Sequence, residues 1–164
     1  MRIALVGYMG SGKSTVGRLL AEQMNLPFID LDNRIESHEQ MSIADVFRKK
    51  GEPYFRKLES ELLKEILNLE DEFILATGGG TPCFFNHMDL LNERSTTVYL
   101  RCSSPVIEAR LTDSHEDRPL FSTQPGSVER HMKERTNTYD QARIIVNGEL
   151  PPPELSVYIQ SYFE

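Results

Sequence analysis

The sequence predicts an α/β fold in which helices cover both faces of a five-stranded parallel sheet. Five short, mostly apolar runs are typical of strands buried on both faces. They lie at residues 3–6, 28–32, 73–77, 97–100 and 144–146. Longer stretches with apolar residues at helical spacing separate them, and such alternation of strand and helix is typical of a three-layer α/β/α domain.

Composition limits the functions that the chain can have. Its 164 residues predict one domain, and no apolar run reaches the length of about 20 residues that a membrane span needs. The net charge of −7 argues against a nucleic-acid partner, which would require a basic face. Residues 1–4 lead straight into the first strand and leave no room for a signal peptide. We therefore expect a cytoplasmic protein.

The cysteines and histidines give no sign of a metal site or a disulfide. Cys83 and Cys102 are the only cysteines, and we expect buried or half-buried thiols. The histidines show no ligand spacing, which favours surface or helix positions for each. They are His38, His87, His115 and His131.

A glycine-rich segment after the first strand matches the phosphate-binding motif G-x-x-x-x-G-K-[ST] from Gly7 to Ser14. Helical spacing from Val16 onward supplies the helix that the motif requires. Backbone N–H groups and the helix N-terminus can bind phosphates, Lys13 adds a charge, and the Ser14 hydroxyl can bind Mg²⁺. The predicted phosphate-binding residues are Gly10, Ser11, Gly12, Lys13, Ser14 and Thr15.

Two aspartates close the second predicted strand. In an extended chain, Asp30 and Asp32 point to the same side, beyond the carboxyl end where α/β sheets bind ligands. Crowded carboxylates repel unless a cation or a proton lies between them, and nucleotide-bound Mg²⁺ would provide one. Alternatively, one aspartate only caps the helix that begins near Arg34.

Two helices follow, at about residues 42–50 and 52–69. Ser42 and Asp45 form a capping box at the first. In the second, Arg56 and Glu59 lie three residues apart at the edge of an apolar stripe that runs to Leu69. This spacing fits a surface ion pair or a guanidinium oriented in a pocket, and the pattern by itself favours the surface pair.

Three consecutive glycines, at residues 78–80, follow the third strand. Such a run predicts close approach of a ligand or another backbone, with N–H groups presented to it; a flexible turn is the alternative. We expect helices at about residues 85–91 and 104–111 on either side of the fourth strand. A helix at residues 154–163 is predicted to end the chain.

Residues 112–126 are polar and without period, which is typical of a lid, and Arg118 is a charge that lid closure could deliver. The next helix, at about residues 127–139, carries Val128, Arg135 and Tyr139 on one stripe. Arg135 is therefore expected to point inward. A buried arginine needs an anion, either a structural carboxylate or a bound ligand.

In this order and spacing, the segments resemble the shikimate kinase family along nearly the whole chain. The resemblance rests on residues 7–15 with Gly17, 30–32, 42–47, 51–52, 55–56, 59, 78–80, 118–120, 135 and 139. It implies a P-loop kinase fold with sheet order 2-3-1-4-5, a mobile lid at about 112–124 and a substrate-binding region at about 32–60. It also implies a monomer that uses Mg²⁺ and ATP to phosphorylate the 3-hydroxyl of shikimate, with ADP as product.

The resemblance also implies roles for individual residues. Asp32 would hold the attacking hydroxyl, and Asp30 would act near Mg²⁺ through water, alongside Ser14. Arg56 and Arg135 would bind the substrate carboxylate, and Lys13 and Arg118 would neutralise the transferring phosphoryl group. Arg110 would lie over the adenine. The other substrate-binding residues would be Phe47, Phe55, Glu59, Gly78, Gly79 and Gly80.

Two alternatives share the phosphate loop. A gluconate kinase, which shares the general fold, would not require the carboxylate-recognition set of Asp32, Arg56 and Arg135. A nucleotide-dependent switch predicts a guanine-reading Asn-Lys-x-Asp, which the sequence lacks. The segment 147–153 departs from the family pattern, because it lacks the basic and amide residues that often contact adenine.

Overall fold

Five parallel strands form one sheet in a computed structural model that describes residues 1–114, 124 and 126–164. The strands are β1 (Arg2–Val6), β2 (Phe28–Asp30), β3 (Phe73–Ala76), β4 (Thr96–Arg101) and β5 (Ile144–Asn147). Their order is β2-β3-β1-β4-β5, and Ile3 of the central strand pairs with Ile74 on one side and Thr96 on the other. The predicted parallel sheet and its order are confirmed.

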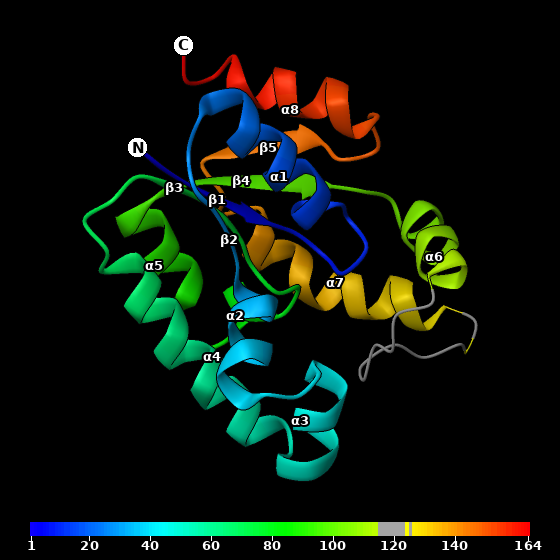
Figure 1. Ribbon diagram of the computed structural model, residues 1–164. Coiled ribbons are helices and arrows are strands. Elements are labelled where there is room, and N and C mark those ends of the chain that lie inside the picture. The colour runs from blue at the N-terminus through cyan, green and yellow to red at the C-terminus, as the bar shows by residue number, and fades with distance from the viewer. Residues whose placement is uncertain (115–123, 125) are drawn as a thin grey trace.

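Helices cover both faces of the sheet (Figure 1). Helices α1 (Lys13–Met24) and α8 (Pro152–Gln160) lie together on one face. The remaining helical segments of the described residues pack on the other face or beyond the sheet edge. They are α2 (Leu31–Glu39), α3 (Ile43–Lys50), α4 (Glu52–Leu67), the 3₁₀ turn η1 (Thr81–Cys83), α5 (His87–Arg94), α6 (Ser104–Asp113) and α7 (Ser127–Tyr139). No helix in these ranges is long and apolar enough to span a membrane.

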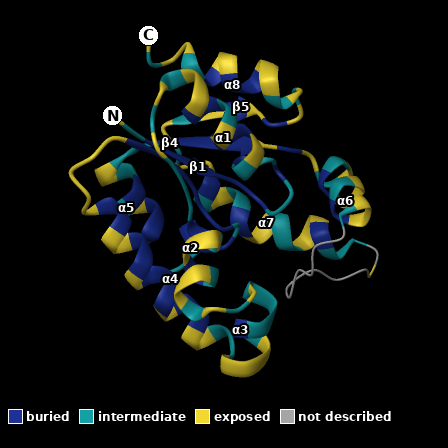
Figure 2. Cartoon of the chain, viewed as in Figure 1, coloured by how far each residue is buried: buried dark blue, intermediate teal, exposed yellow. Residues whose placement is uncertain are grey.

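The strands divide the core into two layers. Figure 2 shows β1 and β4 as buried strands between the helices. In β1, Ile3 and Leu5 pack against α1 and α8, whereas Ala4 and Val6 join the larger layer under α4 and α7. Successive side chains of a strand point to opposite faces. A run that is apolar at every position therefore fits a strand covered on both sides, as predicted.

The second strand is shorter than predicted. It ends at Asp30, and α2 begins at Leu31, so Asp32 lies in the first turn of a helix. The Asp30 carboxylate accepts a hydrogen bond from the Asn33 N–H at 3.3 Å and caps that helix. The prediction of a strand to residue 32 was wrong, because the capping bond stabilises the helical turn one residue after Asp30.

The other predicted elements are present with shifted ends. Ser42 caps α3 as predicted, because its hydroxyl accepts from the Asp45 N–H at 3.1 Å. Helix α4 ends at Leu67, so Leu69, assigned to its apolar stripe, is instead 38% exposed. Cys83 is half-buried and Cys102 is buried, as expected, and both are free thiols.

Candidate active site

The glycine loop between β1 and α1 folds tightly enough to turn back on itself. Gly7, Gly10 and Gly12 have φ angles of 146°, 79° and 94°, which only glycine adopts readily. The Lys13 ammonium donates to the carbonyls of Gly7 at 2.8 Å and Tyr8 at 2.9 Å. The loop therefore keeps a positive charge at the N-terminus of α1, where the helix dipole also favours anions.

A cavity of about 500 Å³ opens above this loop. Its lining includes every predicted phosphate-binding residue and Arg110; these are Gly10, Ser11, Gly12, Lys13, Ser14, Thr15 and Arg110. The Arg110 guanidinium donates to the carbonyl of Gly10 at 3.2 Å and to that of Gly148 at 3.3 Å. It thus joins the phosphate loop to the segment between β5 and α8.

The resemblance assigned the segment 147–153 to the adenine, but the sequence prediction named none of its residues as site residues. Gly148, Leu150 and Pro152 line the cavity beside Arg110. A Cβ atom on Gly148 would lie 2.8 Å from the Cys102 sulfur, so only glycine fits there. No local pattern marks this packing, because the two residues are far apart in the sequence.

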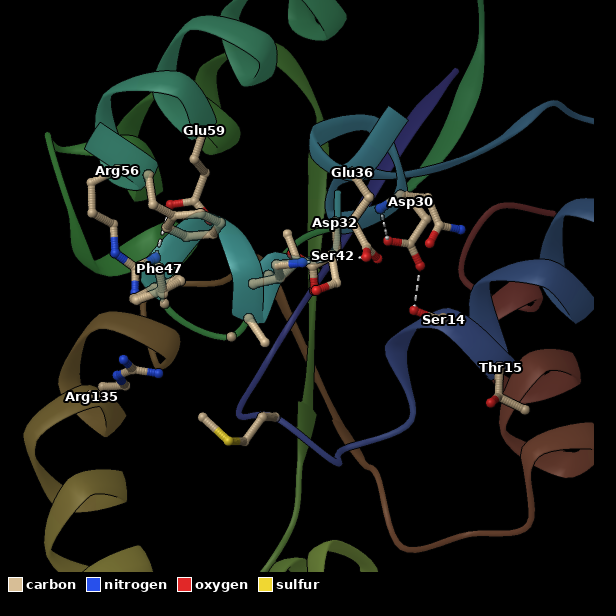
Figure 3. Close-up of a pocket in the computed structure, with 18 of the residues that line it drawn as sticks. Ser14, Thr15, Asp30, Asp32, Glu36, Ser42, Phe47, Arg56, Glu59 and Arg135 are labelled. Carbon is tan, nitrogen blue, oxygen red and sulfur yellow. Dashed lines mark hydrogen bonds and ion pairs between the residues drawn. The ribbon is translucent and has the colours of Figure 1, made fainter. Parts of the chain in front are cut away.

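A second cavity, of about 570 Å³, shares lining residues with the first. Figure 3 shows side chains that line it. Its lining includes every residue predicted for the substrate and the metal. They are Ser14, Asp30, Asp32, Phe47, Phe55, Arg56, Glu59, Gly78, Gly79, Gly80 and Arg135. The two cavities share Met9, Ser14, Thr15, Asp32 and Gly79. They therefore form one chamber whose two halves meet at Asp32 and Ser14.

One side of the chamber is acidic. The Ser14 hydroxyl donates to the Asp30 carboxylate at 2.5 Å, and both point into the cavity with Asp32 (Figure 3). Burial, followed by the charges of Asp30 and Glu59, raises the pKa of Asp32 to about 6, while Lys13 opposes this shift. The grouping of Asp30 and Asp32 is as predicted. The reason given for it was wrong, since they lie at a strand end and a helix start.

This acidic side has the donors that Mg²⁺ prefers. A hydroxyl and a carboxylate oxygen from Ser14 and Asp30 lie side by side, and Mg²⁺ usually takes one or two protein ligands beside waters and phosphates. Within residues 1–114, 124 and 126–164, no group of three or more acidic, histidine or cysteine side chains is placed to hold a metal. The residues present therefore fit a cation that phosphate groups help to bind.

The opposite side of the chamber is basic. Arg56 and Glu59 form an ion pair at 2.9 Å, with exposed fractions of only 5% and 1%. The surface pair that the helical pattern favoured was wrong, and the alternative of a guanidinium oriented in a pocket is confirmed. The Arg56 guanidinium lies 4.1 Å from the centre of the Phe84 ring, so residues outside α4 cover the edge of its apolar stripe. The guanidinium is fixed on the cavity wall.

Arg135 approaches the same side from α7 (Figure 3). Arg135 is only 6% exposed, which confirms the prediction that its side chain points inward. Its Nη1 atom is buried without a hydrogen-bond partner among the described residues. Because a buried, unpaired donor costs free energy, this atom is placed to bind an anion that enters the cavity.

The three glycines after β3 lie between these groups. A Cβ atom added to Gly78 would lie 3.1 Å from the Asp32 carboxylate, and one added to Gly79 would lie 3.0 Å from the Met9 backbone nitrogen. A Cβ atom added to Gly80 would lie 2.6 Å from the Arg56 guanidinium. The Tyr139 hydroxyl also donates to the Gly79 carbonyl. The predicted close approach is confirmed, and no larger residue fits the turn without displacing a neighbour.

Other predicted features lie outside the described residues or behind the cavity. Arg118, His115 and all but residues 112–114 and 124 of the predicted lid fall in the segment that the structure does not describe. His87 lies in a helix, as expected, but it is fully buried behind the glycine turn. His87 bonds to the Thr81 carbonyl and to the Ser60 hydroxyl, 27 residues away, so ligand spacing could not reveal these partners.

The comparisons with known proteins agree with this geometry. The model of the family described as shikimate kinase matches residues 9–161. A shikimate kinase of Aquifex aeolicus (strain VF5) is 42% identical over 155 residues, which cover 94% of this chain and 91% of the relative.

Solved structures give the same result. A crystal structure of the Aquifex aeolicus vf5 shikimate kinase has a TM-score of 0.88 and 40% identity, covering 99% of this chain and 96% of that one. A shikimate kinase from Acinetobacter baumannii in complex with shikimate has a TM-score of 0.89 and 32% identity, covering 99% and 92%.

Proposed function

This chain belongs to the shikimate kinase family, and we propose that its chamber brings ATP and shikimate together for transfer of the γ-phosphoryl group to the 3-hydroxyl. Family members are ATP-dependent kinases that phosphorylate a shikimate hydroxyl. One observation carries the assignment of the reaction to this chamber: the phosphate-loop cavity and the arginine-lined cavity share Asp32. Family membership does not favour the gluconate kinase alternative.

The basic side of the chamber suits the carboxylate of shikimate. Arg56 offers a planar fork held by Glu59, and Arg135 offers a buried donor that lacks a partner. Bidentate pairs between arginine and carboxylate are short and strong. Phe47 and Phe55, whose ring centres lie 4.5 Å apart, form an apolar wall for the ring carbons. Bound in this way, the acid would turn its hydroxyls toward Asp32.

The phosphate loop suits the donor. Backbone N–H groups of residues 10–15 and the N-terminus of α1 would bind the β- and γ-phosphates, and Lys13 would neutralise their charge. Arg110 lies between the loop and Gly148, where it would contact the rest of the nucleotide. The γ-phosphate of ATP would thereby approach Asp32 from the side opposite Arg56 and Arg135.

Asp32 is suited to receive the proton of the attacking hydroxyl. With a pKa of about 6, Asp32 is ionised in most molecules at neutral pH, and its carboxylate is more basic than that of an ordinary aspartate. As the acceptor oxygen bonds to the γ-phosphorus, the bond from phosphorus to the bridging oxygen of ADP breaks. The hydroxyl proton passes to Asp32. Positioning and charge neutralisation supply most of the catalysis in such transfers.

We propose that Ser14, and Asp30 through water, hold Mg²⁺ beside the phosphates. When bound, the ion supplies positive charge to the phosphate oxygens. The Ser14–Asp30 contact supports this assignment, because it sets the hydroxyl and the carboxylate toward the place where the phosphates would lie.

Four predictions from the sequence remain predictions. They are a lid at residues 112–124 that brings Arg118 to the phosphates, one domain with a substrate-binding region at 32–60, a monomeric state, and a cytoplasmic location. Size-exclusion chromatography with light scattering tests the monomer directly.

An acceptor-specificity assay tests the proposed function. Purified protein is given Mg·ATP with shikimate, gluconate or no acceptor, and ADP release is followed. We expect shikimate-dependent turnover, with the phosphate located on the 3-hydroxyl by phosphorus–proton NMR. Faster turnover with gluconate, or ADP release that ignores the acceptor, would reject the proposal.

A further inference from the structure

A buried histidine lies behind the acceptor half of the chamber without lining either cavity. His87, at the start of α5, is 0% exposed. Its Nδ1 atom lies 2.9 Å from the Thr81 carbonyl oxygen, and its Nε2 atom lies 2.8 Å from the Ser60 hydroxyl. A carbonyl can only accept, so Nδ1 carries the hydrogen. Nε2 then accepts from Ser60, and the surroundings select one tautomer.

Three hydrogen bonds and the adjacent residues Glu59 and Ser60 form a closed ring through His87, and the ion pair of Arg56 joins this ring at Glu59. The Thr81 hydroxyl donates to one oxygen of Glu59 at 2.8 Å, and the other oxygen accepts from Arg56 at 2.9 Å. Ser60 follows Glu59 on α4. The path from Glu59 through Thr81 and His87 therefore returns to α4 at the next residue, and it ties together α4, the turn η1 and α5.

Every member of this ring is withdrawn from water. Glu59, Ser60, Thr81 and His87 have exposed fractions between 0% and 6%. A broken bond in such a place leaves a polar group that water cannot satisfy.

The neutral state of His87 supports the ring. Burial lowers the pKa of His87, with the Thr81 carbonyl and Glu59 opposing the shift and Lys64 and Arg56 reinforcing it. The neutral imidazole keeps Nε2 as an acceptor for Ser60.

We propose that His87 is a positioning residue for acceptor recognition, holding Thr81 so that Thr81 fixes Glu59 and Glu59 fixes the guanidinium of Arg56. The inference rests on the proposed function, because it assumes that Arg56 binds the carboxylate of shikimate. His87 touches no substrate. It acts through three hydrogen bonds in series, and the bond to Thr81 is the one that transmits its effect.

Two conservative variants separate the two hydrogen bonds of His87. The amide of asparagine occupies the level of Nδ1, so His87→Asn keeps a donor for Thr81 and loses the contact with Ser60. The amide of glutamine occupies the level of Nε2, so His87→Gln keeps Ser60 and loses Thr81. His38→Asn is the matched control, because the His38 side chain is 54% exposed on α2.

The readout is the Michaelis constant for each substrate, measured with shikimate and with its carboxamide. We expect His87→Gln to raise KM for shikimate about five- to twentyfold, as for loss of one buried hydrogen bond. We expect the KM for ATP and kcat/KM for the carboxamide to stay within twofold of wild type. His87→Asn and the control should stay within twofold on all three. A purely structural role would instead affect both acceptors equally.

The outcomes separate the two proposals. Absence of shikimate turnover by the wild-type protein would reject the proposed function. Suppose that the wild type turns over shikimate and that Arg56→Lys raises the KM for shikimate. If the two His87 variants then behave alike, the proposed function stands and the inference about His87 fails. If His87→Gln does not fold, nitrogen-15 NMR of the wild-type imidazole decides. An Nδ1–H tautomer supports the ring, and an Nε2–H tautomer overturns it.

Discussion

The guanidinium of Arg56 packs directly on the backbone of Gly80. A Cβ atom on Gly80 would lie 2.6 Å from Nη2 and 3.0 Å from Cζ of Arg56. Arg56 is also held by Glu59 and by the ring of Phe84. The absence of a side chain at residue 80 is therefore part of how the arginine is oriented.

Gly80→Ala should move Arg56 without disturbing the backbone. Gly80 has φ of −86° and ψ of −14°, which alanine adopts freely, and the atoms nearest to the added methyl group belong to the Arg56 guanidinium. We expect KM for shikimate to rise about tenfold, a loss of about 1.4 kcal/mol in acceptor binding, with KM for ATP unchanged. Steady-state kinetics measure both constants. An unchanged KM for shikimate would show that Arg56 is free to shift.

Arg135→Met should weaken acceptor binding without weakening the fold. The unpartnered Nη1 atom is a cost in the free protein and a donor in the complex. We expect KM for shikimate to rise about 10- to 100-fold, and the unfolding temperature without ligand to stay level or rise. Arg94→Met, at an exposed position on α5, serves as the control. An effect confined to ATP would contradict the assignment of Arg135 to the acceptor.

The activity of the wild-type protein should fall in mild acid. If Asp32 must be ionised to take the hydroxyl proton, kcat/KM for shikimate rises with pH through the pKa of about 6 in the free protein. We expect half of the maximal value near pH 6, measured with shikimate and Mg·ATP both well below their KM values, so that the profile reports the free protein. A profile that stays flat down to pH 4.5 would exclude Asp32 as the base.

Asp32→Asn should abolish transfer and stabilise the free protein. The folded pKa of Asp32, about 6, lies above the ordinary value of 3.8. The protonated carboxyl therefore favours the folded state below pH 3.8, and this contribution is lost as the pH rises through 6. Asparagine removes the charge, so we expect a gain of about 1 kcal/mol at pH 7.5 and a smaller gain at pH 5.

Thermal unfolding of both proteins at the two pH values measures this difference. Equal gains at pH 5 and pH 7.5 would contradict the raised pKa. Loss of activity together with loss of stability would show that asparagine disturbs the start of α2.

Local pattern was sufficient for the phosphate loop. Its residues are adjacent in sequence, and glycine adopts the positive φ angles of Gly7, Gly10 and Gly12 without steric cost. The inward position of Arg135 was also predicted correctly, since helical spacing alone sets which residues share the face of Val128.

Local pattern failed where the covering residues come from elsewhere. Arg56 and Glu59 lie at the edge of an apolar stripe, and spacing cannot tell whether that edge meets water or another segment. Phe84 and the glycine turn cover it, which makes the pair buried. For Asp30 and Asp32, the grouping was predicted, but a single capping bond decided between strand and helix.

The sequence by itself determined the succession of strands and helices along the chain and the phosphate loop, because apolar periodicity and glycine conformation act over a few neighbouring residues. The predicted roles of most other site residues came from the resemblance to the family. Only the tertiary structure decided how these residues act together. The ring through His87, Thr81 and Glu59 contains hydrogen bonds between residues 22 and 27 apart in the sequence, and the pKa of Asp32 depends on charges from β2, α1, α2 and α4. Hydrogen bonding and burial of this kind exist only once the sheet and helices have packed.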